Sequence, residues 1–564
     1  MNVRNLLTDL IIRIMVSRGK RGLKMMHQNS INGRSKNDEL LFRILRKNQT
    51  CEYGKRYHFD EIHSIEDYRR MVPISDYSCY EPYIQRMINN NETNLITSLP
   101  LVGYSQSSGS IGTRKFVPLT RDSVNTYTNY TFTRMMANAD NYWKAHGKKG
   151  LNPGRGVYTV PGYSEHLPNG LPCTNASDVP AQQLSFLFPY ILITPFPKLY
   201  TAQEIDHRYI YFRFALEDTT TMFFFGIFFK DIVDYFKYLE TNWEPLLDDI
   251  ASGTISEFAH ADKKTKAELM HYIRPNPERA AQLRKEFEKG FDDTIIARIW
   301  PNLQVINAIG TATFETFANL ARKHTRGIPF DFSIYGASEG LFAAADSLES
   351  PNQLLLLDSC YYEFIPEDDE SRILSIDELE IGKRYEIIIT NQSGLYRYRC
   401  GDVIIVIDYL NECPYIQFVY RKGQLLNLTG EKTTEEHMRQ AVHELENESS
   451  VSIHHWAVYN STDDYPFHYV LLVENEEEKD LSGYSAFLHE SLKDINIRYN
   501  HFINTRKIGS IQIRNLKYGT NKVWMEKQVA KGVPPSQVKP VRILDTPEKM
   551  DFFLSAIQDH PSVS

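Results

Sequence analysis

Hydrophobic residues recur at helical spacing from the first residues of the chain. Over residues 1–25 they alternate with charged residues so that one face of a helix is apolar, and that face holds Leu6, Leu7, Leu10, Ile11 and Ile14. We expect this helix to pack on its own domain, with contact to a membrane surface as the alternative. Asp9 and Arg13 interrupt the apolar run, so a signal peptide is not expected.

Longer stretches carry the same helical pattern. Residues 36–92 are typical of helical segments and turns, and residues 120 to about 136 of a helix. Ile227 to about Trp243 predicts a long helix, which Pro245 should end. The segment 147–180 is rich in Gly, Pro and Asn and predicts an irregular excursion.

Short apolar runs between these helices predict strands. They lie at 304–309, 330–335, 354–357 and 385–390, and a further run is closed by Pro195 and Pro197. A helix from Thr311 to about Lys323 separates two of them, and this alternation predicts an α/β sheet with ligands at the strand exits. The cluster Phe223–Phe225 fits plain core packing, or alternatively the lining of an acyl pocket.

After about Gly423 the pattern changes to a charged helix, 433–446, followed by alternating runs at 451–459, 469–474 and 508–514. Such a pattern is typical of a small α+β domain. The length of 564 residues also favours two domains. We therefore expect a large domain over 1–422 and a small domain over 423–564.

Composition narrows the functional class. The net charge of -8 and the pI near 6.1 argue against a nucleic-acid-binding protein, which normally presents a basic face. No apolar run approaches the roughly 18 residues of a membrane-spanning helix. The six cysteines are scattered, so the sequence predicts neither a disulfide framework nor a zinc site. This cysteine usage favours a reducing compartment, the cytoplasm. We expect a monomer.

One loop has the composition of a phosphate-binding turn. Residues 107–115 read Ser-Ser-Gly-Ser-Ile-Gly-Thr-Arg-Lys and place hydroxyls, glycines and cations together. Glycine allows the backbone to approach a ligand closely, and consecutive N–H groups make a concave anion site. The loop is not a P-loop, because Lys115 follows Arg114 and precedes Phe116. A plain surface turn is the alternative interpretation.

Three later segments complete an ordered set. They are Tyr335-Gly336-Ala337-Ser338-Glu339, then Tyr396-Arg397-Tyr398-Arg399-Cys400-Gly401-Asp402, then Gln537-Val538-Lys539-Pro540. Each alone fits a structural residue or a solvated charge. In this order, together with the loop, they resemble the adenylate-forming superfamily of acyl ligases.

The resemblance is closest to the plant auxin-responsive acyl acid–amido synthetases, the Gretchen Hagen three family. It extends from about residue 40 to 545, and it includes Trp300-Pro301-Asn302-Leu303, Leu239-Glu240-x-x-Trp243 and Glu431-Lys432-Thr433-Thr434-Glu435. Three departures stand out. Ile111 replaces the usual Ser or Thr, the loop is one residue shorter than in plant members, and Lys539 lies in Gln-x-Lys-Pro. The last feature favours the amido synthetase branch over acyl-CoA synthetases.

The resemblance implies a large α/β adenylate-forming domain and a small, mobile α+β C-terminal domain. It also implies ATP and Mg²⁺ as cofactors, and a carboxylic acid and an amino acid as substrates. The catalytic residues would be Lys539 and Glu339, and Glu339 would also hold Mg²⁺. Nucleotide-binding residues would be Ser107, Ser108, Gly109, Ser110, Lys115, Tyr335, Gly336, Ala337, Ser338 and Asp402, with Arg421 and Lys432 at the nucleotide or the hinge.

The residues are also compatible with two other functions. One is a CoA ligase of the same superfamily, although no basic patch for CoA is evident near the hinge. The other is a non-catalytic protein that binds an acyl acid or a nucleotide. The retention of Glu339, Asp402 and Lys539 favours an enzyme over this last alternative.

Overall fold

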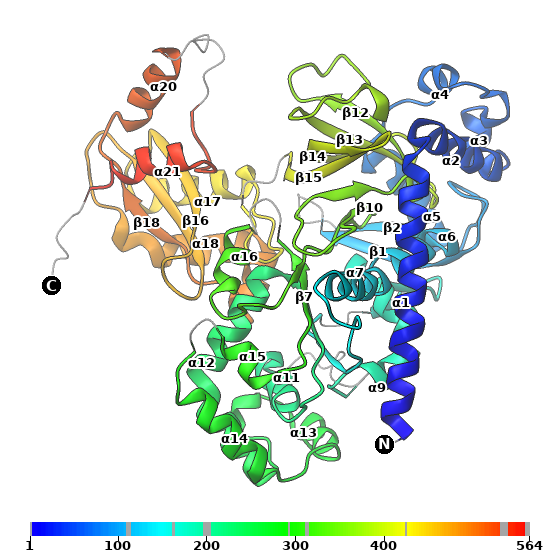
Figure 1. The fold of residues 1–564 in the computed structure, drawn as a ribbon. Helices are drawn as coiled ribbons and strands as arrows, with labels where there is room; N and C mark the ends of the chain where they lie inside the picture. The colour runs from blue at the N-terminus through cyan, green and yellow to red at the C-terminus, as the bar shows by residue number, and fades with distance from the viewer. Residues whose placement is uncertain are drawn as a thin grey trace. The chain divides into compact units, whose positions relative to one another are not determined.

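The computed structural model describes residues 3–108, 114–160, 164–195, 205–291, 294–310, 315–422, 426–530 and 540–558 (Figure 1). Its internal contacts divide these residues into two compact units, one running to Tyr420 and the other beginning at Arg421. Both units combine sheets with packed helices, so the expected α/β class is confirmed. No described helix has the length and hydropathy of a bilayer-spanning segment.

The first unit contains three sheets. Seven strands form the largest, in the order β12 (Cys360–Pro366), β13 (Arg384–Asn391), β14 (Tyr398–Leu410), β15 (Cys413–Arg421), β11 (Gln353–Leu355), β10 (Gly340–Ala344) and β9 (Ile334–Ala337). A second sheet has the order β2 (Arg114–Thr120), β1 (Leu101–Ser108), β5 (Pro172–Asn175) and β4 (Ser164–His166). The third is parallel, with β3 (Gly156–Tyr158), β6 (Phe223–Phe228), β7 (Val305–Ile309) and β8 (Phe330–Asp331).

Helices of the first unit surround these sheets. They are α1 (Val3–Ser30), α2 (Gly33–Asn48), α3 (Glu52–Arg56), α4 (Ile65–Met71), α5 (Tyr77–Asn89), α6 (Arg121–Tyr130), α7 (Phe132–Ala145), α8 (Val179–Leu184), α9 (Phe188–Ile191), α11 (His207–Ala215), α12 (Phe229–Ser252), α13 (Lys263–Met270), α14 (Pro277–Phe287), α15 (Ile295–Ile299) and α16 (Glu315–Arg322). The second unit holds the sheet β16 (His455–Ser461), β17 (His468–Glu474) and β18 (Gln512–Asn515) with α17 (Glu435–Ser449), α18 (Ser485–Ile495), α19 (Ile497–Asn504), α20 (Thr520–Ala530) and α21 (Pro547–Leu554).

Several predicted elements are confirmed. The helical region 36–92 contains α2 to α5, and the runs at 304–309, 354–357 and 385–390 are β7, β11 and β13. The predicted C-terminal helix is α17, capped by Thr434, whose hydroxyl accepts the N–H of His437. The predicted helix start at Thr311 lies outside the described residues.

Other predictions were wrong, and each has a physical reason. The segment 147–180 contains the short strands β3, β4 and β5. Strand β3 pairs with the distant β6 and β5 with the distant β1, while β4 pairs with β5. The run before Pro195 begins in the short helix α9, and beyond it Leu192 forms an isolated β-bridge with Gly156 instead of a full strand. Helix α12 continues to Ser252, because the backbone leaves helical angles at Asn242 and Pro245 then falls in the first turn of the continuing helix, where a missing N–H costs little.

The N-terminal helix exists and packs on its own unit, as expected, but not through the apolar face that the sequence shows. Leu6, Leu7, Leu10 and Ile14 are exposed, whereas Ile12 and Met15 are buried with Thr8 and Gly19. Helices α1 and α7 lie side by side (Figure 1). They are so close that a Cβ atom on Gly19 would stand 1.9 Å from the carbonyl oxygen of Thr133. Close backbone approach, instead of the largest apolar residues, therefore decides which face of α1 packs inward.

The aromatic cluster Phe223–Phe225 belongs to β6. Phe223 and Phe224 are fully buried, and Phe224 packs against Phe236 and Trp300 with ring centroids 5.9 and 6.3 Å apart. Plain core packing accounts for these two side chains.

Candidate functional site

Glu339 lies in the turn between β9 and β10. These strands pair antiparallel, with Ala337 opposite Gly340, so the predicted segment 335–339 enters a tight hairpin instead of leaving a parallel strand. The Glu339 side chain is buried, with 6% of its surface exposed. Its Oε1 accepts the hydroxyl of Tyr398 at 3.3 Å, and its backbone oxygen accepts the Asn391 amide at 2.7 Å.

The other carboxylate oxygen of Glu339 is buried and has no hydrogen-bond donor among the described residues. An ionised carboxylate oxygen without a donor is costly in a protein interior. A hard cation such as Mg²⁺ satisfies such an oxygen and commonly takes one or two carboxylates together with substrate phosphate oxygens. Glu339 therefore has the properties expected of a Mg²⁺ ligand.

Tyr335 and Asp402 are brought together across the largest sheet. The Tyr335 hydroxyl donates to Asp402 Oδ2 at 2.8 Å, and both side chains are buried. The Tyr335 ring packs against Phe342 and Phe418, with centroids 5.2 and 5.5 Å apart. Two residues separated by 67 positions thus share one local environment.

A bulge in β14 places Asp402. The register passes from Ile388 opposite Arg399 to Glu386 opposite Val403, so three residues of β14 face a single residue of β13. Gly401 occupies this bulge with φ +81°, a conformation that glycine adopts without strain. Bulges re-aim the neighbouring side chains, which explains why Gly401 directly precedes Asp402.

The start of β14 is held by a buried polar network. Arg397 donates to both oxygens of Glu363, at 2.8 and 3.2 Å, and to the backbone oxygens of Arg69 and Val72. The Tyr80 hydroxyl accepts the Tyr396 N–H at 2.8 Å. These contacts tie the segment that carries Tyr398 and Asp402 to the N-terminal helices.

The stem of the predicted phosphate loop is a hairpin. Ser107 pairs with Lys115 and Ser108 with Arg114 in the β1–β2 register, while Gly109 and Ser110 lie outside the described residues. The Ser338 hydroxyl donates to the backbone oxygen of Gln106 at 2.9 Å. The loop stem therefore lies beside the turn that carries Glu339.

Lys115 has an aromatic neighbour. Its ammonium lies 5.4 Å from the centroid of the Tyr77 ring. Burial raises the pKa of Tyr77, and the carboxylates of Glu81 and Glu339 raise it further. The phenol of Tyr77 therefore stays neutral, donating to and accepting from the backbone of Phe116.

Arg421 lies at the boundary between the two units, and Lys432 belongs to the second unit. Arg421 ends β15, and Lys432 lies in the turn before α17 with φ +47°. The buried carboxylate of Glu431 shapes this turn by accepting the N–H groups of Leu428 and Thr429 and the hydroxyl of Tyr469. Lys539, the expected C-terminal catalytic lysine, lies outside the described residues.

The structure adds three residues that the sequence interpretation did not assign. Tyr398 and Asn391 contact Glu339, and the Tyr127 hydroxyl donates to the backbone oxygen of Ala337 at 3.0 Å. Tyr398 stood inside the motif that contains Asp402, so its position was a usable signal. Asn391 and Tyr127 carry no local signal, because only strand pairing and helix packing bring them to the turn.

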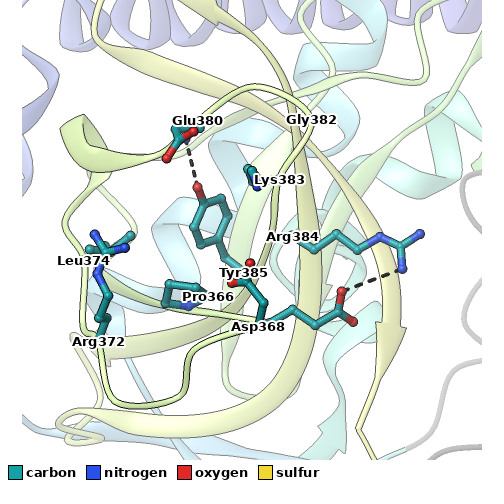
Figure 2. Close-up of a pocket in the computed structure, with 10 residues that line it drawn as sticks. Pro366, Asp368, Arg372, Leu374, Glu380, Gly382, Lys383, Arg384 and Tyr385 are labelled. Atoms are coloured by element: carbon teal, nitrogen blue, oxygen red, sulfur yellow. Dashed lines mark hydrogen bonds and ion pairs between the residues drawn. The ribbon is translucent and has the colours of Figure 1, made fainter. Parts of the chain in front are cut away.

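A surface cavity of about 440 Å³ lies elsewhere on the first unit (Figure 2). Its lining is largely charged, with Glu367 paired to Arg384 at 3.8 Å and the Tyr385 hydroxyl accepting the N–H of Glu380 at 2.9 Å. The register places Pro366 opposite Tyr385 and Cys360 opposite Asn391, about 20 Å apart along the strands. The cavity contains none of the predicted site residues.

Family models match almost the whole chain. The GH3 family N-terminal domain matches residues 22–330, the GH3 family central domain 353–421 and the GH3 family C-terminal domain 435–548. The first match includes the β1–β2 loop, the second includes Asp402, and the third includes Lys539.

Similar proteins carry the same family name. The 4-substituted benzoates-glutamate ligase GH3.12 of Arabidopsis thaliana is 26% identical over 553 residues, covering 92% of this chain and 94% of its own. The indole-3-acetic acid-amido synthetase GH3.8 of Oryza sativa subsp. indica is 26% identical over 568 residues, covering 95% and 92%. A solved structure, AtGH3.15 acyl acid amido synthetase in complex with 2,4-DB, has a TM-score of 0.64 at 22% identity and covers 96% and 97%.

Proposed function

The chain belongs to the GH3 family, as its motifs predicted, and we propose that it is an ATP-dependent acyl acid–amido synthetase. It joins a carboxylic acid to an amino acid through an acyl adenylate. The observation that carries the proposal is the convergence of Glu339, Tyr335 and Asp402 beside the stem of the 107–115 loop. Family membership supports the same reaction, because the relatives compared above are named as ligases and amido synthetases.

The reaction has two balanced steps. In the first, a carboxylate oxygen of the acid attacks the α-phosphorus of ATP, and pyrophosphate leaves with the electrons of the broken P–O bond. In the second, the amino nitrogen attacks the acyl carbon of the adenylate, AMP leaves, and the nitrogen loses a proton. The products are an amide, AMP and pyrophosphate.

Each residue has a role suited to its chemistry. The 107–115 loop binds the leaving phosphates through N–H groups and hydroxyls, with Lys115 supplying positive charge. On ATP binding the Ser338 hydroxyl exchanges the backbone oxygen of Gln106 for the α-phosphate. Tyr335 supports the adenine, and Asp402 accepts the ribose hydroxyls. Glu339 would hold Mg²⁺, which would neutralise phosphate charge.

We assign the remaining roles to residues in the C-terminal part of the chain. Lys539 neutralises the charge that grows on the α-phosphate and the attacking carboxylate, and Arg421 and Lys432 contact the nucleotide or the hinge. We place the boundary of the large ATP- and acid-binding domain at residue 422, and residues 423–564 form the small domain that carries Lys539. Rotation of that domain exchanges the adenylation site for the aminolysis site. We expect a cytoplasmic monomer.

The test is a screen of carboxylic acids for acid-dependent pyrophosphate release, with indole-3-acetate and substituted benzoates included. Positive acids are then incubated with pooled amino acids or with CoA, and the products are identified by mass spectrometry. An amide product with AMP supports the proposal. A thioester with CoA and no amide would assign the chain to acyl-CoA synthesis, and release of ADP and phosphate would exclude adenylation.

A further inference from the structure

The N-terminal half of α1 presents large apolar side chains to solvent. Leu6, Leu7, Leu10 and Ile14, here called the leucine face, are between 39 and 58% exposed. The opposite side of the same helix is occupied by its packing on α7. Because the backbones of α1 and α7 already touch at Gly19, α1 cannot rotate to bury the leucine face without losing that packing.

A segment that packs against the buried side of α1 also exposes aromatic side chains. The Thr8 hydroxyl donates to the backbone oxygen of Tyr190 at 2.7 Å, which places α9 beside the start of α1. Tyr190 is 37% exposed, and Phe186, two residues before α9, is 69% exposed. Exposed aliphatic and aromatic side chains are the residues that enter the interface of a lipid bilayer.

The same helix face becomes basic further along. Arg21 and Lys24 are exposed and have no ion-pair partner among the described residues. Lys24 follows Leu6 by five helical turns, so the two residues share one direction from the helix axis. A flat anionic surface laid on this side of α1 therefore meets the leucine face and these two cations together.

Charge favours an anionic surface over a second copy of the chain. Residues 1–30 contain six Lys and Arg and one Asp, a net charge of +5, in a chain whose net charge is -8. A symmetric dimer through this face would bring like charges together. We propose that the leucine face and the basic half of α1 form a docking surface for an anionic phospholipid bilayer, with α1 lying in the plane of the interface.

The test uses the full-length protein and vesicles of phosphatidylcholine with or without phosphatidylserine. We expect sedimentation with the phosphatidylserine vesicles, reduced by high salt, and little with phosphatidylcholine alone. Leu10→Ser/Ile14→Ser should weaken partitioning by about ten-fold or more, because two apolar side chains no longer enter the bilayer. Arg21→Glu/Lys24→Glu should remove the preference for phosphatidylserine.

Matched controls separate docking from general surface effects. Ile381→Ser removes an apolar side chain of similar exposure, 60%, and Lys263→Glu/Lys264→Glu reverses two exposed charges on α13. Both should bind vesicles like the parent protein, and all variants should keep the parent's melting temperature. The proposal is overturned if the parent does not bind phosphatidylserine vesicles, if Leu10→Ser/Ile14→Ser binds them equally, or if that variant instead dissociates a dimer seen without lipid. These outcomes do not depend on the reaction that the enzyme catalyses.

Discussion

Replacing Tyr398 with phenylalanine tests whether Glu339 holds Mg²⁺. The change removes only the hydroxyl that donates to Glu339 Oε1 at 3.3 Å and keeps the buried ring. Without this donor, the carboxylate loses the contact that orients its second oxygen, which is buried and has no hydrogen-bond donor among the described residues. We expect Tyr398→Phe to weaken Mg²⁺ binding more than ATP binding.

The magnitude follows from the geometry. A hydrogen bond to a charged group contributes roughly 1.5–3 kcal/mol, and an O–H···O distance of 3.3 Å is longer than the usual 2.7–2.8 Å, so we take the lower end. About 1.5 kcal/mol corresponds to roughly a ten-fold rise in the Mg²⁺ concentration that gives half-maximal pyrophosphate release. Residues that orient a metal ligand commonly have effects of about 10- to 100-fold.

The assay measures acid-dependent pyrophosphate release over a Mg²⁺ series at saturating ATP, with calorimetric binding of Mg²⁺ to the ATP-loaded protein as a second readout. Tyr396→Phe is the matched control, because Tyr396 is also buried and its hydroxyl donates to the backbone oxygen of Ile96 at 2.9 Å. We expect saturating Mg²⁺ to restore most of the activity of Tyr398→Phe and to find no Mg²⁺ shift in Tyr396→Phe. An unchanged Mg²⁺ dependence in Tyr398→Phe, or an equal shift in both variants, would refute the assignment of Glu339.

Three further predictions concern other parts of the chain. Asp402→Ala should weaken ATP binding by about ten- to a hundred-fold, because the ribose hydroxyls lose a charged acceptor. Asp408→Ala, at an exposed position of the same strand, should not weaken it. If calorimetry gives Asp402→Ala the same ATP affinity as the parent protein, Asp402 does not belong to the site. Lys539→Ala should slow pyrophosphate release by about 10²-fold and should slow aminolysis of a prepared acyl adenylate far less. The control variant Lys522→Ala should slow neither step. Equal slowing of both steps by Lys539→Ala would contradict a role in adenylation. Burial lowers the pKa of His455 to about 3, so below pH 6.5 the unfolded chain binds a proton there that the folded unit does not, and stability falls as the pH decreases from 6.5 towards 3. His455→Gln should reduce the loss of unfolding free energy between pH 7 and 5 by about 2 kcal/mol, measured by denaturant titration. His454 is exposed, and His454→Gln should leave that loss unchanged.

The sequence alone determined the family, the reaction class and the positions of the motifs. Motifs are readable because their chemistry needs particular residue types at short spacings: glycines and hydroxyls in a phosphate loop, and Gly401 directly before Asp402. Local helices were equally readable where caps and periodicity agree, as at Thr434 before α17. These signals depend on neighbours within a few residues, so they can be recognised without knowledge of the fold.

Tertiary structure decided which distant residues meet. Antiparallel pairing of β9 with β10 places Glu339 in a turn, and pairing of β13 with β14 brings Asn391 and Tyr398 to it. No local pattern encodes such a register, because it depends on segments dozens of residues apart. The orientation of α1 has the same origin: hydrophobic periodicity predicted that its leucines face inward, but close backbone packing at Gly19 turned them to solvent.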